Sequence, residues 1–209
     1  MLTEFQKVFS RIYASHEWNQ GSSPGSHPLN TVQYRSLLQS FFYDSTIKTI
    51  VDLGCGDWQI MNLIDIPKNK QYIGLDVVDS VINENKKRYK APNVNFTLTS
   101  GLLDDLPVGD LLVVKDVLQH WSLKHIELFI NQVLPRYPKT LLTHSYKSYI
   151  PSCQANYNKD IPTGGYRPID LADAPFDLSL KKLLDYVSTA GEIRVYLYES
   201  SQYPTRAEG

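Results

Sequence analysis

A glycine turn follows the first strongly apolar run of the chain. Residues 50–53 read Ile-Val-Asp-Leu, and Gly54 and Gly56 come directly after them. Glycines at such a turn allow backbone angles and a close ligand approach that a side chain would forbid. A pyrophosphate-binding turn needs a further glycine three residues after the second, and that position is Gln59. Since Asp57 also places a carboxylate where a phosphate would lie, the turn favours a cationic ligand.

An acidic residue ends the next apolar run. Asp76 closes the stretch Ile73-Gly-Leu-Asp, about twenty residues after the turn, where a carboxylate can accept hydrogen bonds from ribose hydroxyls. A solvent-facing aspartate at a strand end is the alternative. A cation-binding turn followed by a ribose acceptor fits S-adenosylmethionine, which carries a sulfonium and an α-ammonium group. A NAD-binding dehydrogenase is a more distant interpretation.

Residues that could transfer a proton follow the fourth apolar run. Lys115, Asp116 and His120 stand there, and histidine exchanges a proton near neutral pH. We expect His120, oriented by a carboxylate such as Asp116, to act as the general base that deprotonates an acceptor hydroxyl. A histidine that caps or packs the following helix is the alternative. His144, after the next apolar run, is a second candidate.

A long loop over residues 146–177 is rich in Pro, Gly, Tyr and Asp. Its residues Tyr166, Arg167 and Asp170 interleave an aromatic ring with polar groups, a pattern that suits a carbohydrate. Internal Asp–Arg pairs within an ordered loop are the alternative. The aspartates could also ligate Mg²⁺, but no spacing requires a metal, and we predict none.

The elements that must position these groups alternate between strand and helix. Between residues 47 and 145, the pattern predicts a doubly wound, Rossmann-like α/β fold: a mostly parallel sheet with helices on both faces. The carboxyl ends of its strands then meet along one edge, where ligands bind. The expected strands are 49–53, 72–76, 94–98, 111–115 and 140–143, and the expected helices are 58–65, 79–90 and 122–134.

The two ends of the chain complete a predicted single domain over residues 1–209. Residues 1–46 combine helical periodicity with a turn-rich insert, in which Trp18 and Ser23 are expected to belong to a lid over the cofactor. A plain surface loop is the alternative. Residues 146–209 are expected to hold the acceptor loop, a helix at 178–189 and one strand at 193–199. A single strand there implies an abbreviated C-terminal hairpin.

Composition limits the classes of partner. The 209 residues are 42% hydrophobic and 21% charged, which argues against disorder, and the net charge is −1. A nucleic-acid binder usually has a basic excess, so we expect no nucleic-acid partner. The apolar runs are too short to insert in a membrane. Cys55 and Cys153 lack a metal-ligand spacing, and reduced thiols predict a cytoplasmic location.

These motifs resemble class I S-adenosylmethionine-dependent methyltransferases over residues 50–145. Asp52-Leu-Gly-Cys-Gly, then Gly74-Leu-Asp76, looks like the first motif and the acidic loop of that family, and residues 110–121 resemble its fourth strand and the segment after it. Where many relatives have an acid for the adenine amino group, this chain has Ser100, so Ser100 or backbone groups near Gly101 would contact the adenine, with Leu102 packing on the ring. The cofactor site expected on this basis comprises Trp18, Ser23, Asp52, Gly54, Cys55, Gly56, Trp58, Asp76, Val77, Ser100, Gly101, Leu102 and Lys115.

A narrower resemblance concerns the acceptor. Residues 21–26, 56–58, 115–120 and 164–176 look like small methyltransferases of glycan assembly in bacteria and large DNA viruses, some of them fused to glycosyltransferases. This resemblance implies an O-methyltransferase for a sugar hydroxyl of a glycan or polysaccharide, and a glycosyltransferase domain as a possible partner. A small-molecule or protein methyltransferase, or a non-catalytic cofactor-binding partner of a glycosyltransferase, are the alternatives.

Overall fold

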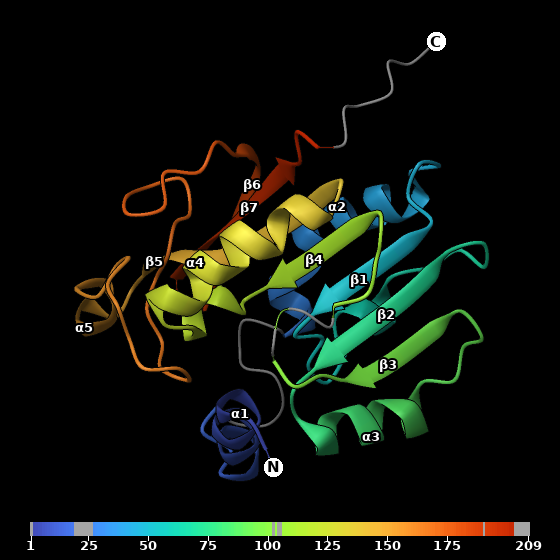
Figure 1. The fold of residues 1–209 in the computed structure, drawn as a ribbon, viewed down its shortest axis with the longest axis horizontal. Coiled ribbons are helices and arrows are strands. Elements are labelled where there is room, and N and C mark those ends of the chain that lie inside the picture. The colour runs from blue at the N-terminus through green and yellow to red at the C-terminus, as the bar shows by residue number, and fades with distance from the viewer. Residues whose placement is uncertain (1, 19–26, 102, 104–105, 190, 203–209) are drawn as a thin grey trace.

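The computed structural model describes residues 2–18, 27–101, 103, 106–189 and 191–202. In this part of the chain, a sheet with the strand order β3-β2-β1-β4-β5-β7-β6 forms the centre of the molecule (Figure 1). β1 to β5 run parallel, and β7 runs antiparallel to both β5 and β6. The strands are β1 (Thr49–Leu53), β2 (Gln71–Asp76), β3 (Val94–Leu98), β4 (Leu111–Lys115), β5 (Lys139–Ser148), β6 (Lys181–Ser188) and β7 (Gly191–Glu199).

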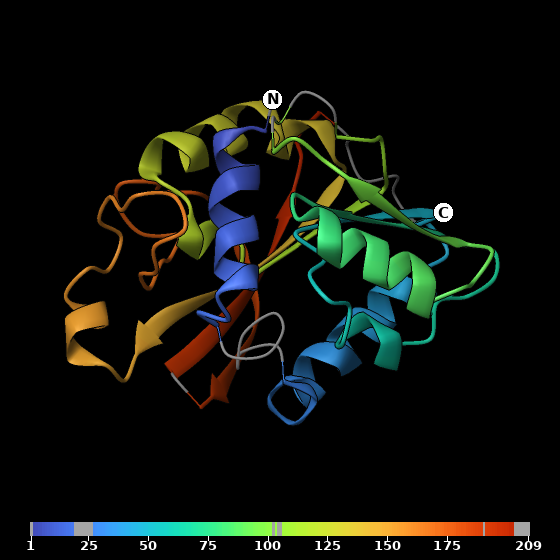
Figure 2. The ribbon, with the colours of Figure 1, turned by 90° about the horizontal axis from the view of Figure 1, so that it is seen from below.

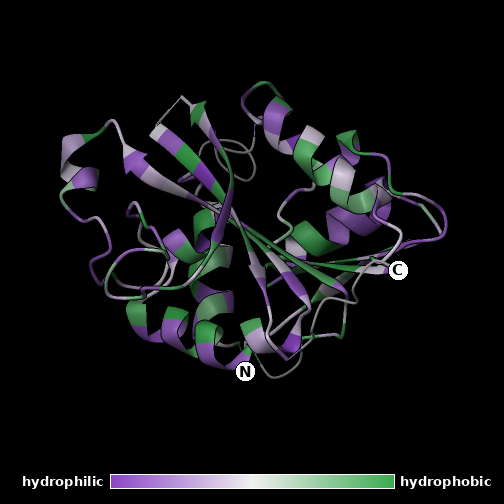
Figure 3. Cartoon of the chain, turned by 90° about the horizontal axis from the view of Figure 1, so that it is seen from above, coloured by the Kyte–Doolittle hydropathy of each residue, from purple (hydrophilic) through white to green (hydrophobic). Residues whose placement is uncertain are grey.

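Helices cover both faces of this sheet. The α-helices are α1 (Glu4–Ala14), α2 (Val32–Tyr43), α3 (Asp79–Arg88), α4 (Leu123–Gln132) and the short α5 (Pro151–Gln154). The side chains of β4 pack on both faces of the sheet. Leu112 and Val114 lie in the core cluster that includes α4. Leu111 and Val113 lie in the cluster that includes α2. All four residues are buried, as strands covered on both faces require. The hydropathy view shows apolar residues concentrated on the central strands (Figure 3). The predicted doubly wound α/β fold is therefore confirmed.

α1 lies across the edge of the sheet where the parallel strands end (Figure 2). Its start is fixed by a capping box, because Thr3 Oγ1 accepts from the backbone N–H of Gln6 and the Gln6 side chain accepts from the N–H of Thr3. Phe5, Phe9 and Ile12 are buried on the helix face toward the core. Because this apolar face packs on the core, the helix covers the edge of the sheet where the parallel strands end.

The C-terminal hairpin corrects one expectation. Residues 181–188 form β6 instead of the predicted helix 178–189, and β6 pairs with β7 from Lys181↔Leu197 to Ser188↔Gly191. Burial alternates at the end of β6, where Tyr186 and Ser188 are buried and Val187 is exposed. This period of two belongs to a strand, so the hairpin is complete and not abbreviated.

The segment after β1 corrects a second expectation. The predicted helix 58–65 is reduced to one 3-10 turn, Met61–Leu63. Trp58 adopts a φ of 60°, a left-handed conformation that an α-helix cannot include. The expected helices 79–90 and 122–134 are present as α3 and α4. Among the described helices, none is long and apolar enough to cross a membrane.

Candidate active site

A cavity opens at the edge of the sheet where β1, β2 and β4 end, beneath α1. It encloses about 1030 Å³ of atom-free space, its open mouth included, which suits a small-molecule ligand. The cavity is lined by Phe5, Phe9, Tyr13, Trp18, residues 52–61, Asp76, Val77, Thr99, Gly101, Leu103, Leu106, residues 115–117, His120 and Trp121. Most of the residues predicted to bind the cofactor therefore lie around one cavity.

The glycine turn after β1 forms the floor of this cavity. Gly54 and Gly56 have φ angles of 76° and 54°, in the left-handed region that glycine adopts readily. A Cβ atom on Gly54 would lie 2.5 Å from Val117 Cγ2. The N–H groups of Gly54 and Cys55 both donate to the carbonyl of Leu75, at 2.8 and 2.9 Å. The turn is therefore held against β2 with its backbone open to a ligand.

Asp76 connects this turn to the end of β2. Its Oδ2 accepts from the N–H of Gly56 and its Oδ1 accepts from the N–H of Val78, both at 3.0 Å. A carboxylate offers about four lone pairs, so each oxygen can still accept a hydrogen bond from a ligand in the cavity. This geometry fits the predicted binding of the ribose hydroxyls.

Asp52 supplies a second carboxylate deeper in the cavity. It is 3% exposed and accepts a hydrogen bond from the hydroxyl of Tyr72. Burial raises the pKa of Asp52 to about 7, against the opposing effect of the Tyr72 hydrogen bond. A ligand that carries positive charge would favour the ionised carboxylate. Asp52 therefore fits a cationic cofactor and disfavours an anionic one.

α1 closes the opposite end, near the residues expected to contact the adenine. Thr3 Oγ1 donates to the carbonyl of Ser100 at 2.5 Å, and Gln6 Nε2 donates to the carbonyl of Thr99 at 3.2 Å. Phe5 packs so tightly on Gly101 that an added Cβ would lie 2.8 Å from it. Ser100 thus uses its backbone to hold α1 and does not line the cavity. The predicted contacts of Ser23 and Leu102 lie outside the described residues.

His120 lies in the cavity wall with one ring nitrogen already bound. Its Nδ1 donates to the carbonyl of Gly165 at 2.7 Å, which leaves Nε2 as the nitrogen with a free lone pair. The ring lies 4.8 Å from that of Trp18 and 5.8 Å from that of Tyr166, centroid to centroid. Burial lowers the pKa of His120 below its usual value of 6.5. The imidazole is therefore neutral and able to accept a proton near pH 7.

Asp116 does not orient His120, contrary to the prediction. Its carboxylate pairs with the ammonium group of Lys115, and both side chains are at most 10% exposed. The other oxygen, Oδ1, has no hydrogen-bond partner among the described residues. Asp116 has a φ of 56°, a conformation that is uncommon outside glycine. The backbone thus holds a buried carboxylate oxygen in the cavity wall, and the carbonyl of Gly165 orients His120.

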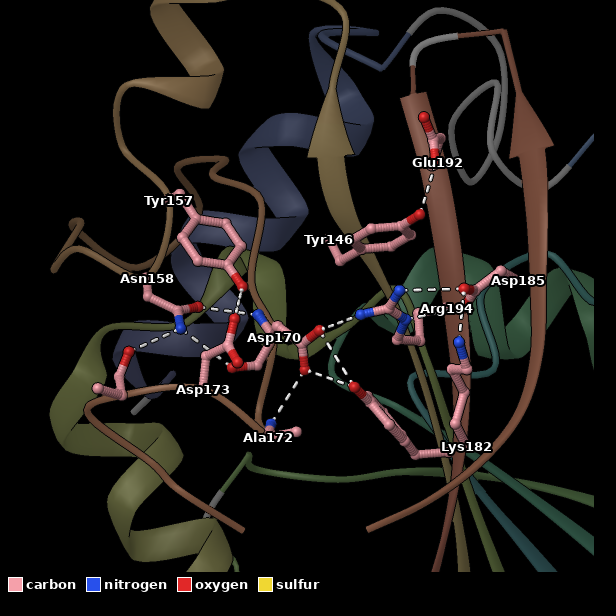
Figure 4. A network of polar contacts seen from close by, with 12 residues as sticks. Tyr146, Tyr157, Asn158, Asp170, Ala172, Asp173, Lys182, Asp185, Glu192 and Arg194 are labelled. Atoms are coloured by element: carbon pink, nitrogen blue, oxygen red, sulfur yellow. Dashed lines mark hydrogen bonds and ion pairs between the residues drawn. The ribbon is translucent and has the colours of Figure 1, made fainter. Parts of the chain in front are cut away.

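None of the four predicted acceptor residues lines the cavity, and Tyr166 only packs near the ring of His120. Arg167 is fully buried and its guanidinium donates to backbone carbonyls. The Asp170 carboxylate binds Arg194 inside the protein (Figure 4), and it also accepts from the hydroxyl of Tyr196. His144 is 1% exposed, and burial lowers its pKa well below the usual value. Arg167 and Asp170 line no part of the cavity and their polar groups bind protein groups, so the predictions for these two residues are wrong. Asp170 does form an Asp–Arg pair, but with Arg194 of β7 and not within the loop.

Several wall residues were not expected from the sequence. Phe5, Phe9 and Tyr13 of α1 line the cavity together with Trp121. The helical spacing of Phe5 and Phe9 predicts only a core-facing stripe, and nothing in that spacing distinguishes a core from a ligand site. Among the described residues, no cluster of three His, Cys, Asp or Glu side chains could hold a metal ion.

Comparison with known proteins places this geometry in context. A family model described as an O-methyltransferase domain matches residues 3–141. Among curated proteins, no sequence matches this chain.

Many solved structures share the fold. One is magnesium protoporphyrin IX methyltransferase from Synechocystis with bound SAH, at a TM-score of 0.64 and 12% identity over 95% of this chain and 100% of the other. The N-methyltransferase NodS from Bradyrhizobium japonicum in complex with SAH has a TM-score of 0.64 and 12% identity over 94% and 98%. The methyltransferase domain of bacterial CtHen1 has a TM-score of 0.62 and 16% identity over 80% and 97%.

Proposed function

Because this chain belongs to the family of O-methyltransferase domains and is an S-adenosylmethionine-dependent methyltransferase, we propose that it methylates a sugar hydroxyl of a glycan or polysaccharide. His120 is the general base. The observation that carries this proposal is the single imidazole in the cavity wall whose Nδ1 is bound to Gly165 and whose Nε2 is left to accept a proton.

The residues around the cavity have separate tasks in this reaction. When bound, S-adenosylmethionine supplies a methyl group that is already activated, so the protein chiefly has to position the acceptor and remove its proton. Asp76 accepts from the ribose, and the ionised Asp52 complements the positive charge of the cofactor. The proton of the acceptor hydroxyl moves to His120 Nε2, which is neutral at working pH because burial lowers its pKa.

Aromatic and acidic groups near His120 support a sugar acceptor. Trp18 and Tyr13 line the cavity on the side of α1, and aromatic faces cover the C–H surfaces of sugars. Asp116 Oδ1, which is buried and without a partner among the described residues, can accept from a hydroxyl next to the one that is methylated. In this proposal, Trp18, Tyr13 and Asp116 contact the sugar in place of Arg167 and Asp170.

The proposal is tested with purified protein and S-adenosylmethionine that carries a tritiated methyl group. The acceptors are methyl α- and β-hexopyranosides, and catechol and a short Lys- and Ser-containing peptide are the comparison compounds. We expect label in the hexosides, with release of S-adenosylhomocysteine and a mass gain of one methyl group. Label in catechol or the peptide but in no hexoside would refute the sugar acceptor. Binding of S-adenosylhomocysteine without transfer to any compound would favour a non-catalytic partner domain.

A further inference from the structure

The loop after α5 holds the segment after β4 at successive points. We call residues 158–169 the holding segment. Gly164 N–H donates to the carbonyl of His120 at 2.8 Å, and Arg167 N–H donates to the carbonyl of Gln119 at 3.2 Å. Asp160 Oδ1 accepts from the N–H of Leu123 at 2.7 Å, at the first turn of α4. The holding segment therefore runs alongside the segment that carries His120.

Arg167 provides the deepest of these contacts. Its Nη1 donates to the carbonyl of Leu118 at 3.0 Å, and its Nε donates to the carbonyl of Lys159 at 3.2 Å. The side chain is fully buried, and burial lowers its pKa to about 10. A buried charge that binds only neutral carbonyls gains little stability compared with an apolar side chain. What it does provide is a fixed distance between the holding segment and Leu118.

That distance matters because Gly165 stands between two of the contacts. Gly164 binds the backbone of His120 on one side, and Arg167 binds Leu118 on the other. The carbonyl of Gly165 is thereby held 2.7 Å from His120 Nδ1. This hydrogen bond selects the tautomer with the proton on Nδ1, which leaves Nε2 free to accept a proton in the cavity.

We propose that Arg167 is a positioning residue for His120. It acts through Leu118 and the Gly164–Gly165 turn and keeps the Gly165 carbonyl against Nδ1. The inference rests on the proposed function, in which His120 is the base. This role explains why the guanidinium group is buried. Arg167 does not line the cavity, and among the described residues its hydrogen bonds go to backbone carbonyls and to no carboxylate.

The test follows the His120 ring itself by NMR of the full chain labelled with ¹⁵N-histidine. The chain has five histidines, and His120→Gln identifies the His120 signals by their loss. Long-range ¹H–¹⁵N spectra report which ring nitrogen carries the proton, and a pH titration reports the pKa. In the wild type we expect the proton on Nδ1 and a pKa below 6.5.

Arg167→Met removes both carbonyl contacts and retains much of the side-chain length. We expect its His120 signals to show mixed tautomers and a pKa closer to 6.5, while the affinity for S-adenosylhomocysteine stays within about twofold. With a sugar acceptor, kcat should fall roughly tenfold or more, and the KM for S-adenosylmethionine should not change. Arg167→Lys, which retains the charge and one contact at a time, should lie between Arg167→Met and the wild type.

Arg136 offers a matched control. Its Nη1 and Nη2 also donate to two backbone carbonyls, those of Leu103 at 2.9 Å and Leu106 at 2.7 Å, away from Gly165. Arg136→Met should lower the unfolding midpoint and leave the tautomer and pKa of His120 unchanged. If Arg167→Met does not fold, Arg167→Lys carries the comparison.

Two results distinguish an error in the positioning role of Arg167 from an error in the assignment of His120 as the base. Wild-type tautomer and pKa of His120 in folded Arg167→Met and Arg167→Lys would overturn the positioning role. An altered tautomer in Arg167→Met, together with normal methyl transfer by His120→Gln, would overturn His120 as the base. In that case Arg167 would still position the His120 ring, but this ring would not be the base of the reaction.

Discussion

Asp170 Oδ2 lies 2.8 Å from Arg194 Nη1, and this ion pair joins the loop after α5 to β7. The same carboxylate accepts from the hydroxyl of Tyr196 at 2.9 Å and from the N–H of Ala172 at 3.0 Å. Arg194 also binds Asp185 and lies 3.8 Å from the ring centroid of Tyr146 (Figure 4). Asp170 therefore anchors the loop, and its oxygens face protein groups.

Asp170→Asn should consequently destabilise the fold. Asparagine keeps the size of the side chain but removes the charge that faces Arg194. We expect the free energy of unfolding to fall by about 1.5–3 kcal/mol, the range for a hydrogen bond to a charged group, in urea titrations followed by circular dichroism. Asp173→Asn is the control, because its partner, the Tyr157 hydroxyl, lies at the surface. An Asp170→Asn protein of wild-type stability that fails to bind acceptor would restore the sugar-binding interpretation.

Gly54→Ala should strongly weaken cofactor binding. The added methyl group would lie 2.5 Å from Val117 Cγ2, at a φ of 76°. Backbone strain of this kind costs roughly 1–3 kcal/mol, and relief by moving the turn would close the cavity floor. Calorimetry should show at least tenfold lower affinity for S-adenosylhomocysteine. In the double variant with Val117→Ala, the part of the affinity loss that is due to the steric clash should be recovered. The part that is due to the positive φ of residue 54 should remain. Wild-type affinity in Gly54→Ala would show that the turn does not approach the ligand.

The affinity for S-adenosylmethionine should rise with pH. Asp52 has a pKa of about 7 in the free protein, and a positively charged ligand lowers that pKa because it stabilises the carboxylate. Binding therefore releases protons near pH 6.5, and the affinity increases with pH and becomes constant about one unit above the pKa of Asp52 in the free protein. Calorimetry in two buffers of different ionisation enthalpy measures the protons released. Asp52→Asn should remove most of this dependence, and proton uptake by the wild type would contradict the assignment.

Methyl transfer should have an acidic limb below pH 6.5. Only neutral His120 accepts a proton, and burial lowers its pKa from 6.5. The rate should therefore be constant above pH 6.5 and fall as the pH drops through the lowered pKa. The measurement is kcat at saturating cofactor between pH 4.5 and 8. A limb above pH 7 would assign the base to another group.

The glycine turn, the parallel strands and the acidic strand ends could be predicted because local residue types determine them. Gly54 has a positive φ, and Asp76 ends a strand in which Tyr72 and Leu75 are buried. Their meeting at one edge then follows from the handedness of the crossovers. The cofactor end of the site is therefore predictable from a single sequence.

The acceptor end depended on contacts between distant segments. Arg167 and Asp170 have the composition of a sugar site, but their partners, Leu118 and Arg194, are remote in sequence. Phe5 has the spacing of a core residue and also lines the cavity. The apolar spacing of residues 181–188 is compatible with a helix. They form a strand because they pair with β7. Such tertiary choices override local propensity.

The most direct test of the proposed reaction is the initial rate of S-adenosylhomocysteine release with methyl hexopyranosides, for the wild type and for His120→Gln at pH 7.5. Glutamine retains a polar side chain and cannot take the proton. The rate of His120→Gln should be about 10²–10⁴-fold lower, the usual contribution of a general base, and its affinity for S-adenosylhomocysteine should be unchanged. Equal rates in the two proteins would contradict His120 as the base that prepares the sugar hydroxyl.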